Sequence, residues 1–386
     1  MGRLRDVELA DLELRGEQVV LRRWRADDAD RVHQIMQDAS MHAFLDRLPQ
    51  PYTRTDAQAF VDDLGHEGRD AGTGLGSAVV ERTSGRVVGA AALRLGADAE
   101  IGYWVAPDAR GHGYAAQATR VLTRFAHEQG VHRIHVDCDL TNLASVRSAL
   151  GAGIPFEGIV RAGATGRDDT PRDVARFARV FDDPVAPVPY AFPALPHGGL
   201  RDGVLALRAM EPADALAYLQ TENDDVSVRW SFDGELTTEA QAQRRCARAG
   251  LDWLVGRQAQ FAMVDVASGR VAGNCQLRNS PLPRVGDVGY AVHPDFRGRG
   301  YTGRALRLMA DWAFDVLGYA RLELGAKTDN VASQRAALAG GFEADGVRRS
   351  RLPNADGSMS DEAWFARLSP GVSPTGAQVT ARRSRP

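Results

Sequence analysis

The sequence is short of lysine, cysteine and long apolar runs. Lys327 is its only lysine among 386 residues, and the other basic side chains are arginines. Its three cysteines, Cys138, Cys246 and Cys275, are too few and too scattered for a disulfide framework or a zinc site. No apolar run could cross a bilayer, and no charged-then-apolar leader for export is seen. These absences predict a cytoplasmic protein without a membrane partner.

The charge balance argues against nucleic-acid binding. The formal net charge is −3, and residues 1–185 hold 23 Arg against 28 acidic residues, which gives −5. The remainder holds 23 Arg and one Lys against 22 acidic residues, which gives +2. A general nucleic-acid binder needs a strongly basic surface, so no such partner is expected. The nine histidines have no metal-ligand spacing, and no metal is predicted.

The chain contains one sequence unit that occurs twice. The stretch 100–115, EIGYWVAPDARGHGYA, returns at 287–302 as DVGYAVHPDFRGRGYT, with an offset of 187 residues. Five prolines between residues 182 and 199 predict a semi-rigid linker, because proline excludes both helix and inner strand. We therefore expect domains at 1–181 and 200–368, followed by a disordered tail at 369–386.

Each half has the same order of patterns. Apolar runs around Ser84-Gly85-Arg86 and around Ser268-Gly269-Arg270 predict a β-hairpin before each repeated stretch. After each stretch, apolar residues recur at helical spacing, and a strand with alternating apolar positions follows. The alternation suggests one half-covered sheet in each half.

The glycine-rich loops, residues 110–115 and 297–302, are suited to an anion. Glycine lets the backbone approach a ligand closely, and the helix that follows adds unpaired N–H groups and a partial positive charge. An arginine stands at the entrance of each loop, at Arg110 and Arg297. A P-loop would need Gly-Lys-Ser/Thr, which is absent, and a dinucleotide fold would place its glycines after the first strand. The alternative is an ordinary strand-to-helix turn.

With these loops, both halves resemble the GNAT superfamily of acyl-CoA-dependent N-acetyltransferases, whose pyrophosphate loop is Arg/Gln-x-x-Gly-x-Gly/Ala. The first copy fits this pattern at every position, whereas the second ends in Thr302. Gly-Tyr in the strand and a later Asn-x-x-Ser look most like the branch of the ribosomal-protein N-terminal acetyltransferases. The resemblance implies an α/β (α+β) fold of two tandem domains, each with a mixed, mostly antiparallel sheet flanked by helices. It also implies that the two domains pair like a dimer within a monomer, with acetyl-CoA as co-substrate and no metal.

The resemblance also implies the groups that hold acetyl-CoA. Backbone N–H groups near Trp104-Val105 and Ala291-Val292 would hold pantetheine and the thioester oxygen, and Asn142 and Asn330 would lie beside the cofactor. The loop residues implied to bind the diphosphate are Arg110, Gly111, His112, Gly113, Tyr114 and Ala115, and Arg297, Gly298, Arg299, Gly300, Tyr301 and Thr302.

For catalysis, a base must take the amine proton and an acid must protonate the leaving thiolate. Glu100 and Asp287 open the repeated strands and are the candidate bases; the alternative is a solvated strand end. Ser145 and Ser333, in Asn-x-x-Ser, would be the acids, although Asn and Ser are also common helix caps. Many GNAT enzymes place a Tyr four residues beyond the Ser position. The residues there are Ala149 and Ala337.

The predicted activity is direct transfer of an acetyl group from acetyl-CoA to a primary amine of a small molecule. Two alternatives stay open: a protein N-terminal acetyltransferase, and a non-catalytic acyl-CoA sensor or scaffold. The sequence leaves undecided whether one half or both are active. The acidic first half suggests that its acceptor is cationic.

Overall fold

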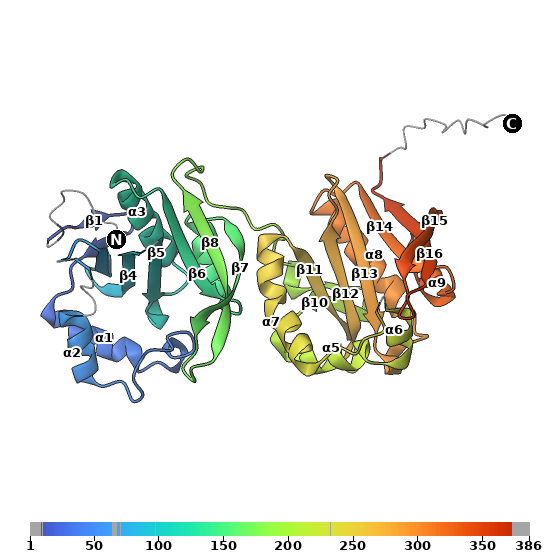
Figure 1. Ribbon diagram of the computed structural model, residues 1–386, viewed down its shortest axis with the longest axis horizontal. Helices are drawn as coiled ribbons and strands as arrows, with labels where there is room; N and C mark the ends of the chain where they lie inside the picture. The colour runs from blue at the N-terminus through green and yellow to red at the C-terminus, as the bar shows by residue number, and fades with distance from the viewer. Residues whose placement is uncertain are drawn as a thin grey trace. The chain divides into compact units, whose positions relative to one another are not determined.

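A computed structural model describes residue 9 and residues 11–63, 68–69, 71–96, 98–231 and 233–372. The chain divides into two compact units, Met1–Tyr190 and Ala191–Pro386. Figure 1 shows a twisted sheet with packed helices in each unit. Within the described ranges, no helix is both long enough and apolar enough to span a membrane.

The N-terminal domain is built on an eight-stranded sheet in the order β1-β2-β3-β4-β5-β6-β8-β7. Only β5 and β6 pair in parallel. The strands are β1 (Leu14–Arg15), β2 (Val19–Arg22), β3 (Gly74–Glu81), β4 (Val87–Leu95), β5 (Ala99–Val105), β6 (Arg133–Asp139), β7 (Phe156–Thr165) and β8 (Pro171–Val180). The α-helices are α1 (Ala29–Met36), α2 (Arg54–Asp62), α3 (Tyr114–Glu128) and α4 (Leu143–Gly151).

The C-terminal domain repeats this topology, with the order β9-β10-β11-β12-β13-β14-β16-β15 and one parallel pair, β13 with β14. The strands are β9 (Leu200–Arg201), β10 (Leu205–Ala209), β11 (Gln258–Asp265), β12 (Val271–Asn279), β13 (Val285–Val292), β14 (Arg321–Lys327), β15 (Glu343–Pro353) and β16 (Met359–Leu368). The α-helices are α5 (Ala215–Glu222), α6 (Asp225–Trp230), α7 (Glu239–Val255), α8 (Tyr301–Asp315) and α9 (Val331–Ala339). The prediction of a mixed, mostly antiparallel sheet flanked by helices in each half is confirmed.

The helix after each glycine-rich loop provides much of its domain's core. In α3, Ala118, Leu122 and Ala126 are fully buried at a spacing of four residues, so one stripe of the helix faces the sheet. In α8 the buried stripe includes Trp312, whose ring lies 5.6 Å from those of Trp253 and Phe261. Such aromatic clusters bury large areas, and the loop is thereby anchored to the best-packed part of the domain.

An arginine–aspartate pair, buried in the N-terminal domain and partly buried in the C-terminal domain, fixes the start of each domain's first helix. Arg22 donates two hydrogen bonds to Asp28, at 2.7 and 2.8 Å, and both residues are buried. Asp28 also accepts from the backbone N–H of Arg25, which closes the 3₁₀ turn that leads into α1. Arg208 and Asp214 repeat the pair at 2.7 and 2.6 Å. The aspartate thus organises the turn before the helix through an ion pair rather than capping the α-helix directly.

The proline-rich stretch 182–199 holds no α-helix or strand, and the boundary between the two units falls within it. Its first part returns to the N-terminal domain, where Val188 N–H donates to the carbonyl of Leu150 at 2.8 Å. Its second part belongs to the C-terminal domain, where Phe192 is 2% exposed. The first part of the stretch is therefore attached to the N-terminal domain, and its second part is attached to the C-terminal domain. The predicted tail at 369–386 lies outside the described residues from 373 onward.

Candidate active site

The site in each domain begins where two parallel strands separate. β5 pairs with β6 only at Ala99 and Glu100, although β5 continues to Val105. β13 pairs with β14 over residues 285–287 only, and then continues to Val292. Beyond these pairs the second half of each repeated strand has no ladder with its parallel neighbour in the described structure. The sheet therefore opens at its middle, beside Trp104, Val105 and Val292, where the sequence predicted backbone contacts to pantetheine.

The glycine-rich loop connects this opening to the helix. Gly111 and Gly113 have φ values of 85° and 76°, and Gly298 and Gly300 have 71° and 72°. These are left-handed conformations, which other residues adopt at a cost. An ideal Cβ at any of the four positions would meet no atom within 4 Å, so the loops border open space.

The first turn of each following helix presents unpaired amides. The first helical hydrogen bond of α3 runs from Gln117 N–H to the Gly113 carbonyl, and α8 begins in the same way with Arg304 and Gly300. No side chain caps either helix. Unpaired amides and the helix dipole together favour an anion at this position. Both loops therefore have the geometry of a diphosphate site.

A tyrosine holds each helix start to the preceding hairpin. Tyr114 donates to Glu81, which also accepts from Ser84. Tyr301 donates to Asp265 at 2.6 Å, and Asp265 accepts from Ser268 as well. The hydroxyl groups of Ser268 and Tyr301 lower the pKa of Asp265, and Ser84 and Tyr114 do the same for Glu81. Tyr114 and Tyr301 therefore each brace their own glycine-rich loop against the preceding hairpin.

The arginines at the loop entrances have protein partners. Arg297 Nη2 lies 2.5 Å from Asp224 Oδ2, at the N-cap of α6, and the bond to Arg297 is the main cause that lowers the pKa of Asp224. Arg110 Nη2 lies 3.3 Å from the sulfur of Met41. A diphosphate in the C-terminal loop would approach an Arg297 that is already paired with Asp224. In the N-terminal loop it would approach the exposed guanidinium of Arg110, which lies beside the thioether of Met41.

The remaining predicted loop residues surround the glycines. His112 is exposed and stacks on Tyr114 at 5.4 Å, and Arg299 lies over the ring of Phe296 at 5.1 Å. Ala115 is buried, and Thr302 is half-buried in the first turn of α8. Ala115 and Thr302 occupy the same position in the first turn of α3 and α8. Both have a backbone N–H, so threonine in place of alanine keeps the donor.

The Asn-x-x-Ser motif does cap a helix, and its serine also meets a tyrosine across the opened sheet. Asn142 and Asn330 accept from the backbone N–H of Ser145 and Ser333, at 3.1 and 3.0 Å. The hydroxyl of Ser145 lies 3.1 Å from the hydroxyl of Tyr103. Ser333 and Tyr290 repeat this contact at 2.7 Å. Both readings of the motif are thus compatible: the asparagine serves the backbone, and the serine presents a hydroxyl.

The sequence pointed to Tyr103 and Tyr290 only as part of the Gly-Tyr pattern and did not assign them to the site. The available signal was their identical place in the two copies. Burial raises the pKa of both phenols, so each remains protonated and can donate to its serine. In the N-terminal domain Cys138 also lies 3.2 Å from Ser145, and burial raises the pKa of this thiol to about 12. The thiol is therefore not a nucleophile at neutral pH.

The carboxylates proposed as bases are both ion-paired on the sheet surface. Glu100 lies 3.6 Å from Arg94, and Asp287 accepts from Arg278 Nε at 3.0 Å. Trp104 stacks with Trp24, at 6.3 Å between ring centroids, and so joins an aromatic cluster with Phe60. At the position of Trp104 the C-terminal domain has Ala291. The two domains therefore differ in what lies against the same strand.

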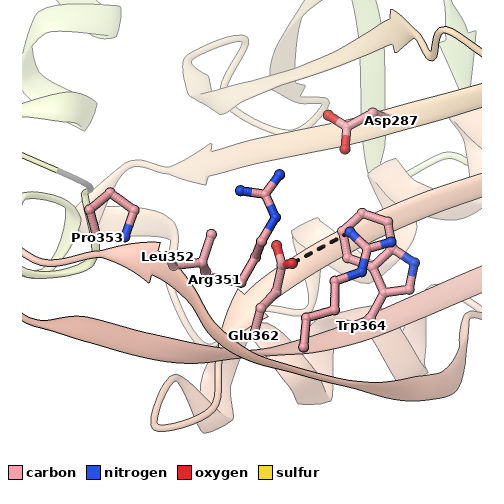
Figure 2. Close-up of a pocket in the computed structure, with 7 residues that line it drawn as sticks. Asp287, Arg351, Leu352, Pro353, Glu362 and Trp364 are labelled. Carbon is pink, nitrogen blue, oxygen red and sulfur yellow. Dashed lines mark ion pairs between the residues drawn. The ribbon is translucent and has the colours of Figure 1, made fainter.

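Asp287 also lines a pocket in the C-terminal domain. The pocket has a volume of about 350 Å³. Figure 2 shows the carboxylates of Asp287 and Glu362 and the guanidinium of Arg351 directed into one space, beside the indole of Trp364. The lining residues are Asp287, Arg348, Arg351, Leu352, Pro353, Glu362 and Trp364.

The comparisons with known proteins agree with this geometry. The family model described as "Acetyltransferase (GNAT) domain" matches the chain twice, over residues 18–154 and 205–343, which is more than half of its length. The chain belongs to the GNAT acetyltransferase family. Its two matches are a tandem duplication of one domain, and membership makes the chain an acetyl-CoA-dependent acyltransferase.

Individual relatives correspond to one of the two domains. YjcK of Bacillus subtilis, described as a probable N-acetyltransferase, is 26% identical over 44% of this chain and 97% of its own. YdaF of the same organism, described as a proposed ribosomal N-acetyltransferase, is 27% identical over 42% of this chain and 91% of its own. A ribosomal-protein-S5-alanine acetyltransferase from Vibrio fischeri is similar in structure, with 19% identity, a TM-score of 0.41, and coverage of 46% and 99%.

Among the described residues, no group of three or more His, Cys, Asp or Glu side chains could hold a metal ion.

Proposed function

We propose that the protein transfers the acetyl group of acetyl-CoA directly to the primary amine of a small molecule. The observation that carries this proposal is the recurrence, in each domain, of a serine–tyrosine hydroxyl pair beside an opened strand and a left-handed glycine loop. The loop supplies amides for the diphosphate, and the opened strand supplies amides for pantetheine and the thioester oxygen.

In this proposal Ser145 and Ser333 protonate the leaving thiolate. Each serine already faces a phenol that stays protonated, so the phenol can donate a hydrogen bond to the serine oxygen while the serine proton goes to the thiolate. Tyr103 and Tyr290 would then hold the serine hydroxyl in place. Asn142 and Asn330 fix the serine backbone at the start of α4 and α9.

A small acceptor is supported by the pocket of the C-terminal domain. Its volume of about 350 Å³ lies at the lower end of the range of small-molecule sites, roughly 300–1,000 Å³. A protein N-terminus is the second candidate, since YdaF is described as a proposed ribosomal N-acetyltransferase.

The experiment is a steady-state assay of thiol release from acetyl-CoA against two matched panels: small primary amines, and short peptides with free N-termini. Products are identified by mass. Faster acetylation of small amines, with kcat/KM at least ten-fold higher, is the expected result. Peptides as the better substrates would replace the first candidate with the second. Binding of acetyl-CoA without thiol release on either panel would favour an acyl-CoA sensor or scaffold.

A further inference from the structure

Glu362 is a buried carboxylate that takes no part in the loop and serine–tyrosine contacts of the site. It is 6% exposed, and its side chain lies over Gly325, where an added Cβ would clash with the Glu362 carboxylate. Within the described part of the chain, no group donates a hydrogen bond to its Oε2 atom. Arg348 Nη1 lies 3.6 Å from this oxygen, which is beyond normal hydrogen-bond length. A buried carboxylate oxygen without a donor is costly unless a ligand supplies one.

The position of Glu362 places this oxygen at the opened sheet. β16 pairs with β14, and Gly325 and Lys327 of β14 lie opposite Trp364 and Glu362. β14 has separated from β13 after Asp287, so the space over Gly325 adjoins the gap. Glu362 and Asp287 line the same pocket, and Figure 2 shows both carboxylates directed into it.

The other wall of the pocket keeps Glu362 in one place. Arg348 packs flat on Trp364, with Cζ 3.3 Å from the ring centroid, and pairs with Glu362 from that position. Asp287 is engaged at one oxygen, because Arg278 donates to its Oδ1 through both Nε and Nη2. Oε2 of Glu362 is a buried carboxylate oxygen without a hydrogen-bond donor among the described residues.

In the described part of the N-terminal domain, apolar residues occupy the positions of Arg348 and Glu362. Strand register aligns Arg348 and Glu362, which pair on β15 and β16, with Val160 and Val174, which pair on β7 and β8. Arg176 stands where the C-terminal domain has Trp364, and it donates to both oxygens of Asp137. The same place in the fold is apolar or already ion-paired.

From this we propose that Glu362 is the catalytic base of the C-terminal domain: it holds the ammonium of the acceptor in this pocket and takes its proton. The proposal rests on the proposed function and deepens it, because it assigns the acceptor site to one domain. It also shifts the base from Asp287, the candidate that the sequence suggested, to a residue on another strand.

Acetyl transfer with Glu362 as the base conserves protons. Glu362 takes one proton from the ammonium, and the neutral nitrogen then forms its bond to the thioester carbon as the carbon–sulfur bond breaks. The nitrogen loses a second proton, which balances the proton that Ser333 delivers to the thiolate. The proton on Glu362 leaves to solvent. One amide, one free thiol and one proton result.

The pH dependence follows from the charges around Glu362. Burial raises the pKa of its carboxyl above the ordinary value of 4.5; Arg348 and Arg351 of β15 oppose this rise, whereas Asp287 of β13 adds to it. Lys327, its register partner on β14, points its ammonium at the Ser231 carbonyl. A base must be ionised, so activity of this domain falls as the pH drops through the raised pKa.

The test uses the full chain with Gly113→Asp, which disables the loop of the N-terminal domain, and the best small amine as acceptor. Glu362→Gln keeps the shape but removes the base, and we expect kcat/KM to fall about 100-fold with loss of the acid limb of the pH profile. Glu343→Gln, an exposed carboxylate on β15, is the matched control and should leave both unchanged. Acetyl-CoA affinity by calorimetry should be equal in all three proteins, which also shows that they are folded.

A second carboxyl in the domain could produce an acid limb. Burial also raises the pKa of Glu222, which accepts from Asn274 at 3.1 Å, so Glu222→Gln is measured in parallel. An acid limb that disappears in Glu222→Gln but persists in Glu362→Gln overturns the proposal. So does a Glu362→Gln rate equal to that of Glu343→Gln. If Gly113→Asp alone abolishes turnover while one acetyl-CoA site remains, the C-terminal assignment is wrong, yet the proposed function stands in the N-terminal domain.

Discussion

Tyr301, the first residue of α8, donates its phenolic hydrogen to Asp265 at the end of β11 across 2.6 Å. The two residues are 36 positions apart, and the bond ties the glycine-rich loop to the hairpin that precedes it. Tyr114 and Glu81 make the same contact in the N-terminal domain. The loop conformation is thus held from outside as well as by its glycines.

The first prediction concerns this brace. Tyr301→Phe should weaken acetyl-CoA binding by the C-terminal domain roughly ten-fold, because the loop loses a charge-assisted bond while its amides remain. Calorimetry on the full chain with Gly113→Asp isolates the remaining site. Tyr319→Phe, a tyrosine elsewhere in the same domain that hydrogen-bonds to Asn279, is the control. Unchanged affinity in Tyr301→Phe would show that the brace does not position the loop.

The brace also has a pH dependence. The bonds from Ser268 and Tyr301 lower the pKa of Asp265 below its ordinary value of 3.8. A lowered pKa stabilises the folded state above the unfolded-state pKa, and this stabilisation is lost as the pH falls through the folded-state value. We therefore expect Asp265→Asn to be less stable than wild type at pH 7, with the difference shrinking below about pH 4. Denaturant titrations across this range measure it; a difference that grows toward low pH would contradict the assignment.

A third prediction separates the two loops. Gly113→Asp and Gly300→Asp should each abolish acetyl-CoA binding in one domain, since a carboxylate would be forced against the diphosphate. Non-glycine residues at positive φ also carry strain of about 1–2 kcal/mol. Gly85→Asp and Gly269→Asp, at hairpin turns with φ of 70° and no atom within 4 Å of an added Cβ, carry the strain without the repulsion.

Calorimetry should count two sites in wild type and in both hairpin controls, and one in each loop variant. Equal losses in the hairpin controls would mean that strain, rather than charge, causes the effect. Two sites in both loop variants would show that the glycine-rich loops do not bind the diphosphate.

The fourth prediction compares the buried pair Arg22–Asp28 with the partly buried pair Arg208–Asp214. Asp28→Asn leaves Arg22, which is 8% exposed, without its partner carboxylate, and breaking a buried pair costs about 3–5 kcal/mol. The N-terminal domain should then unfold about 10 °C lower. Asp214→Asn should cost less, because the side chain of Arg208 is 31% exposed and can be hydrated. Calorimetric scans of the full chain compare them; a larger loss in Asp214→Asn would contradict the ranking.

The sequence was most informative where local chemistry decides the conformation. The hairpins around Ser84 and Ser268, the left-handed glycines and the helix caps at Asn142 and Asn330 all depend on neighbours within a few residues. Each of these features occurs in both halves of the sequence, and this repetition made a chance match improbable. The mixed sheet was expected from the resemblance to GNAT proteins rather than from these local patterns.

Contacts between distant strands could not be predicted in this way. Arg297 meets Asp224 from 73 positions away, and the position of Glu362 is occupied by Val174 in the other half, so the repeat gave no signal for this carboxylate. A carboxylate in an alternating strand looks like a surface residue until the register places it over Gly325. Burial and the missing donor, which mark Glu362, exist only in three dimensions.

The scarcity of lysine noted in the sequence has a further consequence for an enzyme that acetylates amines. Lys327 is 7% exposed, its ammonium donates to the Ser231 carbonyl at 2.8 Å, and burial lowers its pKa. Arginine side chains are not acceptors for this chemistry, so the folded surface offers almost no amine for self-modification. Acetylation of the enzyme's own lysine should therefore be rare, and acetyl-lysine that appears during turnover points to a substrate.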